Sequence, residues 1–186
     1  MDTQHVDRAV NPTLKALDAV LSLVDRAKET SVPLKGSVWE VATSRVVGLE
    51  RFESSARELR RELNEWKDET ENLERSLREL EAAVEESEGE GEADYDRLVD
   101  EFSEAMRSME SLDEKSARLE TKLREASGRS ANIAERAGGI PVLGSDIQQK
   151  FTTLSARLSK TADDIAETNR KPSDVLDVYP EHRRNG

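Results

Sequence analysis

The chain has 186 residues, of which 37% are charged and 4% aromatic, and its formal net charge is −12. So few aromatic residues are typical of long helices and coiled coils, and unusual for an ordinary globular fold. The acidic balance argues against nucleic acid and anionic membranes as partners, because both are bound through clustered Lys and Arg. Because the chain contains no Cys, disulfides and thiolate metal sites are excluded.

The beginning of the chain has no pattern of a secretory signal. Its most apolar stretch, residues 14–24, is interrupted by Lys15 and Asp18. It is also far shorter than the roughly 20 residues that a membrane span needs. We therefore expect a cytoplasmic protein, and the sequence disfavours a membrane as its partner.

The first predicted helix covers residues 12–30. Asn11 is a good N-cap, and Pro12 suits the first helical position because that position has no helical partner for its amide. The helix is apolar on two faces, so it needs at least two neighbours. Residues 1–10 are expected to form a flexible tail.

A second helix is predicted over residues 38–85. Ser37 and Glu40 form an S-x-x-E capping box at its start. Apolar residues then follow a 4,3 spacing through almost seven heptads, which indicates a long coiled-coil helix. Arg45 and Thr70 are the polar residues in this seam. They either set the register or the choice of partner, or Thr70 simply packs in the seam while Arg45 extends its charged end out to solvent.

The same spacing resumes over residues 95–137, with Ser116 and Ser130 as polar seam positions. Two coiled-coil helices of similar length, joined by a short polar segment, predict an antiparallel hairpin. The acidic segment 85–94 would form its tip. The tip is either a solvated turn or a binding segment, and a charge run is more often the former.

The register of the hairpin can be tested on side-chain volumes. Pairing residues whose numbers add up to 182 puts Trp66 opposite Ser116 and Phe52 opposite Ser130. Large side chains then meet small ones, as close packing of a seam requires. The neighbouring register, which puts Trp66 opposite Met109, remains open.

A fourth helix is predicted over residues 146–170, beginning at a second capping box and ending before Pro172. The fold class is therefore all-α. Residues 11–62 and 120–170 would form a four-helix base, and residues 63–119 a two-helix coiled-coil stalk. Residues 171–186 would form a C-terminal tail.

No motif for chemistry is found. The stretch GGIPVLGS at residues 138–145 resembles a phosphate-binding loop only superficially, because it has no Lys and follows a helix instead of a strand. The two histidines, His5 and His182, lie in the predicted tails. We expect no enzyme activity, no catalytic residue, no metal and no cofactor.

Some apolar residues are candidates for contacts with another chain. They lie on the first helix, beside the seam of the second helix, or in the C-terminal tail, which either packs on the base or acts as a docking peptide. In chain order they are Val20, Leu23, Trp39, Val46, Val175, Leu176, Val178 and Tyr179. For the two tryptophans of the chain, packing in the core is the competing explanation.

The leading functional hypothesis is a non-enzymatic coiled-coil structural or adaptor subunit that mediates protein–protein assembly. Its partners would be other helical chains, in a hetero-oligomer or a homo-oligomer. One alternative is a membrane-surface or membrane-remodelling helical protein, which the acidic charge disfavours. Another is a small acidic chaperone or secretion partner.

Overall fold

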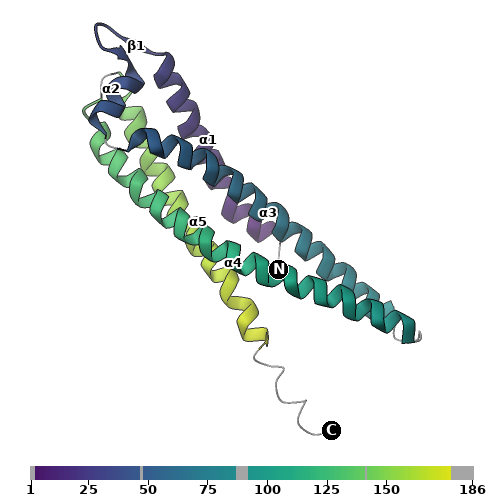
Figure 1. The fold of residues 1–186 in the computed structure, drawn as a ribbon. Helices are drawn as coiled ribbons and strands as arrows, with labels where there is room; N and C mark the ends of the chain where they lie inside the picture. Colours follow the sequence, from purple (N-terminus) through teal and green to yellow (C-terminus); the bar gives the residue numbers. More distant parts are fainter. Residues whose placement is uncertain (1–2, 47, 87–91, 141, 177–186) are drawn as a thin grey trace.

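The computed structural model describes residues 3–46, 48–86, 92–140 and 142–176. The long helices are α1 (Thr3–Glu29), α3 (Leu49–Glu86), α4 (Glu92–Ala137) and α5 (Gly144–Leu176). The short elements are β1 (Ser31–Val32), β2 (Gly36–Ser37) and α2 (Val38–Arg45). Figure 1 shows an all-α bundle, which confirms the predicted fold class.

The four long helices pack in a ring. α1 contacts α3 and α5, and α4 contacts the same two helices. The α3–α4 hairpin extends beyond the N-terminal end of α1, and α5 diverges from the hairpin towards its own C-terminal end (Figure 1). Asp7 of α1 pairs with Lys67 of α3 at 2.6 Å, so α1 lies beside α3 past Leu63. Because α1 is longer than predicted, the part of the hairpin that has covering helices extends further towards the tip than expected.

The predicted start of the first helix was wrong. α1 begins at Thr3, and Pro12 lies inside it. The Asn11 side chain donates to Oδ1 of Asp7, one turn earlier, instead of capping a helix. A proline inside a helix loses one backbone hydrogen bond and costs about 3 kcal/mol. Burial of the preceding turn, where Val10 is fully buried, offsets that cost.

Two buried threonines join α1 to α5 just after this proline. Thr161 Oγ1 donates to the carbonyl oxygen of Ala9 at 2.8 Å and lies 2.7 Å from Thr13 Oγ1. Thr13 Oγ1 also lies 3.1 Å from the carbonyl oxygen of Arg157. Since both threonines are at most 1% exposed, these polar contacts fix the two helices in one register.

The capping box at the start of α2 is confirmed. Ser37 Oγ accepts from the amide of Glu40 at 3.1 Å, and Glu40 Oε2 accepts from the amide of Ser37 at 2.7 Å. The two-residue strands β1 and β2, which the sequence did not predict, pair antiparallel just before this box. Gly36 has φ +80°, and a Cβ there would lie 1.8 Å from Glu40 Oε2. Glycine is therefore needed for this box to close.

The predicted helix 38–85 is interrupted, which corrects the expectation of one continuous helix. Val46 is extended, with φ −115° and ψ 100°, and Gly48 has φ +86°. Glycine reaches this left-handed conformation without the strain that a side chain would cause. Leu49 is 1% exposed and keeps its place in the 4,3 spacing, so the break does not disturb the apolar pattern.

The hairpin adopts the register in which Trp66 faces Ser116. Trp66 Nε1 donates to Ser116 Oγ at 2.7 Å, and both side chains are at most 3% exposed. Ser116 Oγ in turn donates to the carbonyl oxygen of Leu112 at 2.7 Å. The alternative register, with Met109 opposite the indole, is excluded by this pair.

The polar seam positions satisfy their hydroxyl groups within their own helices. Thr70 donates to the carbonyl oxygen of Trp66 at 2.7 Å, and Ser130 donates to that of Ala126 at 2.8 Å. Both are fully buried. Arg45 is the last residue of α2, and its side chain lies outside the described part of the chain.

Two helix ends also differ from the prediction. α5 spans Gly144–Leu176 instead of 146–170 and continues past Pro172, because a proline bends or weakens a helix without always ending it. α4 begins at Glu92 instead of residue 95, so Asp94, which was predicted to lie in the tip, is in the first turn of the helix. Residues 87–91 of the predicted tip lie outside the described residues.

Candidate interaction surfaces

The α3–α4 hairpin has one covered face and one open face. α1 contacts α3 through Arg60 and Lys67, which are seven residues apart. Glu62 and Glu69 follow each of these by two residues, a rotation of roughly 200° around the helix. They therefore lie on the opposite side of the seam from α1. We call this side the open face.

α5 covers the same side of the hairpin as α1. Ser127 of α4 and Ser155 of α5 exchange hydrogen bonds, each hydroxyl donating to the other's carbonyl oxygen at 2.9 and 3.0 Å. Arg129 follows Ser127 by two residues and so lies on the open face. Both covering helices thus leave the other side of the hairpin without a neighbour among the described residues.

Ion pairs cross the seam along the open face. Lys115 Nζ binds Glu69 at 2.5 Å, and Lys122 Nζ binds Glu62 at 2.5 Å and Glu58 at 3.3 Å. The hydrogen bond that Lys122 donates to Glu62 raises the pKa of Lys122, and the one that it donates to Glu58 lowers the pKa of Glu58. Because these side chains are about half exposed, apart from the more buried Glu62, the pairs specify register more than they add stability.

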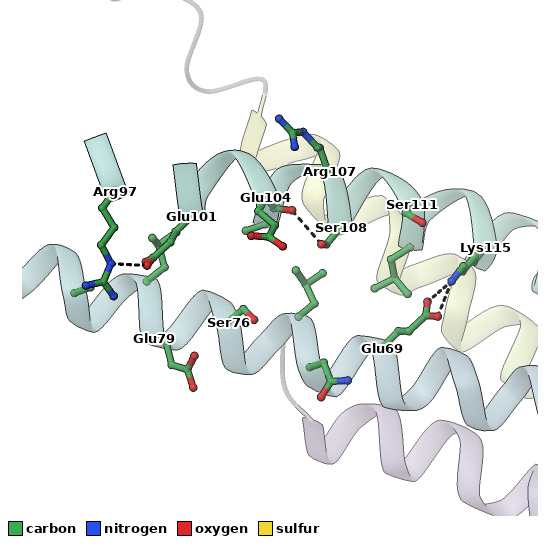
Figure 2. Close-up of a pocket in the computed structure, with 16 residues that line it drawn as sticks. Glu69, Ser76, Glu79, Arg97, Glu101, Glu104, Arg107, Ser108, Ser111 and Lys115 are labelled. Carbon is green, nitrogen blue, oxygen red and sulfur yellow. Dashed lines mark hydrogen bonds and ion pairs between the residues drawn. The ribbon is translucent and has the colours of Figure 1, made fainter. Parts of the chain in front are cut away.

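A groove of about 740 Å³ opens on this face beyond the ion pairs. Figure 2 shows it between α3 and α4, from the pair of Lys115 with Glu69 to the pair of Arg97 with Glu101. Apolar side chains form its floor, and charged and hydroxyl side chains of both helices form its rim. The floor residues are Leu73, Leu80, Ala83, Ala105 and Leu112.

The hairpin also carries exposed apolar residues near its tip. Phe102 is 55% exposed, Val84 50% and Val99 45%, and none of them lines the groove. Phe102 and Val84 fall on the 4,3 spacing of the two hairpin helices, which predicts burial in the seam, and the structure shows that this prediction is wrong for both. A second helix shields only part of each seam residue, and no third helix among the described residues reaches this far.

The structure buries three of the eight candidate interaction residues within the chain. Val20, Leu23 and Val46 are at most 3% exposed and belong to the shared core. They are therefore not free to complete a core with another chain. Trp39 is half-buried, and Lys28 Nζ lies 5.6 Å from its ring centroid, a cation–π contact within the base.

The tail candidates are not placed as surfaces. Val175 and Leu176 are in the last turn of α5, with side chains outside the described part. Val178 and Tyr179 lie outside the described residues altogether. The groove and the exposed tip residues are the surfaces that sequence reasoning missed. The sequence indicated these surfaces only indirectly. The two predicted hairpin helices are longer than the helices predicted to cover them, so part of the hairpin had to remain uncovered.

Neither a metal-binding cluster nor a membrane-spanning helix is present in the described part of the chain. No group of three or more His, Cys, Asp or Glu there could hold a metal ion. None of the helices there is long and apolar enough to cross a membrane. No protein-family model, curated protein or solved structure matches this chain.

Proposed function

We propose that the chain is a non-enzymatic structural or adaptor subunit that binds a helix of another protein in the groove of its hairpin. The observation that carries the proposal is the groove itself, with its apolar floor between two helices and no helix of the described chain above it. Laying an amphipathic helix into an apolar groove is a common mode of protein recognition. At the base, α1 and α5 supply such neighbours from within the chain.

The dimensions of the groove indicate the kind of segment that fits. Arg97 and Lys115 are eighteen positions apart along α4, which is roughly 27 Å at 1.5 Å per residue. A partner helix of about five turns would cover it. Its apolar residues would follow a 3,4 spacing, and its flanks would carry both signs of charge, because the rim does.

Two alanines next to each other provide a matched test. Ala83 lines the groove, whereas Ala82 is exposed and does not line it. Ala83→Arg would place a long charged side chain over the floor, and Ala82→Arg makes the same change outside it. Both substitutions keep a good helix former, so little stability should be lost.

The assay is photo-cross-linking in cells of the native source, from a photoreactive residue placed at Ser76 on the groove rim. We expect discrete protein adducts with the wild type and with Ala82→Arg, and their loss with Ala83→Arg. Equal adducts for the two alanine variants would place the contact elsewhere. No adduct at all, together with a monomer by light scattering, would remove the proposal.

A further inference from the structure

On the open face, basic residues of α4 pair with acidic residues of α3. The series of basic residues on α4 continues beyond the last acidic partner on α3. α4 carries a basic residue at every seventh position from Lys115 to Arg136. The first two have carboxylate partners on α3 at the seventh positions Glu69 and Glu62. The next two positions of that row, towards the start of α3, are Ser55 and Gly48. Neither carries a carboxylate.

The residues that line two hollows between α3 and α4 agree with this pairing of positions. Arg129 lies with Ser55 around one small hollow, and Arg136 lies with Gly48 around another. The second hollow is a cleft of about 430 Å³ at the interruption between α2 and α3. Arg51, Arg129 and Arg136 all line it, and no carboxylate is among the described residues of the lining. We call it the arginine cleft.

The guanidinium groups of the arginine cleft are hardly neutralised by the chain. The side chains of Arg51 and Arg136 form no ion pair or hydrogen bond with the part of the chain that the structure describes. Arg129 has one ion pair, to Glu125 on the preceding turn, at 3.5 Å and with both side chains more than half exposed. An exposed pair of this kind neutralises little. The cleft is thus locally positive in a chain of net charge −12.

The backbone adds to the positive character of the cleft. α3 begins at Leu49, directly after Gly48, so its N-terminal end opens beside the three guanidinium groups. The unpaired amides and the dipole of a long helix favour negative charge at this end. The floor, by contrast, is apolar, because Val46, Phe52 and Ile133 are at most 4% exposed.

We infer that the arginine cleft binds an acidic amphipathic helix of a partner protein. Arg129 and Arg136 are separated by roughly 10 Å along α4, which matches carboxylates seven residues apart on a partner helix. An apolar residue between these carboxylates would reach the floor. The partner would thus supply the acidic half of the row that α3 lacks. The inference builds on the proposed adaptor function, but it concerns a second site with its own chemistry.

The probe is a synthetic helical peptide with Glu at positions i and i+7 and leucines facing the same side between them, carrying a fluorescent label. Binding to the full chain is followed by fluorescence anisotropy at low and high salt. We expect saturable binding that weakens as salt rises, because the contact is largely electrostatic. The same peptide with Gln in place of both Glu should bind at least about tenfold more weakly.

The variant is Arg129→Gln with Arg136→Gln, and its control is Arg75→Gln with Arg118→Gln. Arg118 pairs with Glu114 one turn away, as Arg129 does with Glu125, but it lies outside the cleft. We expect about tenfold weaker binding for the first pair and less than about twofold change for the control. Arg129→Glu with Arg136→Glu should bind a peptide with Lys in place of both Glu.

Three results would overturn the inference. They are equal binding by the cleft variant and its control, equal binding of the Glu and Gln peptides, and displacement of the peptide by millimolar inorganic phosphate. The last result would assign the cleft to phosphate groups instead of an acidic helix. Cross-linking at the hairpin groove should be unchanged in Arg129→Gln with Arg136→Gln, so a failure here and a failure of the proposed function are distinguishable.

Discussion

Replacing Ser116 by Ala should measure how strongly the hairpin register is specified. The Trp66 indole is 3% exposed and gives its N–H to Ser116 Oγ, so Ser116→Ala leaves a buried donor without a partner. Such a donor costs roughly 1–3 kcal/mol. The better helix propensity of Ala returns about 0.5 kcal/mol. We expect the free energy of unfolding to fall by about 0.5–2.5 kcal/mol.

Thermal unfolding followed by circular dichroism is the first measurement. In a chain of this size, 1 kcal/mol shifts the Tm by roughly 2–4 °C, so Ser116→Ala should lower the Tm by about 1–10 °C. Urea unfolding gives the free energy directly. An unchanged urea slope would show that the variant alters stability and not the compactness of either state.

A double-mutant cycle tests the reasoning itself. Trp66→Phe removes the donor and leaves some empty volume, and Trp66→Phe in Ser116→Ala leaves no unsatisfied indole N–H. The double variant should therefore cost less than the two single changes added together, by about 1 kcal/mol. If the two changes add within about 0.3 kcal/mol, the hydrogen bond does not specify the register.

Two further predictions concern strain and pH. Val142 has φ +67° and is 71% exposed, and a β-branched residue is strained in this left-handed conformation, which Asn tolerates better. Val142→Asn should therefore raise the Tm, with a gain of about 0.5–1 kcal/mol in the free energy of unfolding. A lower Tm would contradict the strain. The hydrogen bond from Lys67 lowers the pKa of Asp7, so Asp7 contributes stability above its ordinary pKa of 3.8 that is lost as pH falls through its lower folded pKa. The Tm of the wild type should therefore exceed that of Asp7→Asn at about pH 6, and this difference should shrink towards pH 2. A difference in Tm that does not change with pH would contradict the role of Asp7.

The hairpin was predictable because its signals repeat. Each heptad adds to the same 4,3 spacing, and the volumes of Trp66 and Ser116 were enough to favour the observed register. The interruption at Gly48 was not, because it changes a few backbone torsions while Leu49 keeps its seam position. An apolar pattern reports which residues are buried, and it does not report whether the backbone between them is continuous.

The start of α1 and the candidate surfaces depend on contacts far apart in the sequence. Pro12 is locally a good start, but burial of the turn before it and the Thr13–Thr161 contact, 148 residues apart, favour a longer helix. Phe102 has the pattern of a core residue, and its exposure depends on how far α1 and α5 reach. The basic row ending at Arg136 was visible in the sequence. Only the structure shows that α3 pairs with Lys115 and Lys122 of this row and offers Arg129 and Arg136 no carboxylate.

The side on which α1 and α5 pack has a consequence for affinity. Because both cover one side of the hairpin, the groove and the arginine cleft lie on the other side, about 20 Å apart along α4 between Lys115 and Arg129. A single partner with two suitable helical segments could occupy both at once. After the first segment binds, the second would meet its site at a millimolar effective concentration, so two individually weak contacts would combine into one durable attachment.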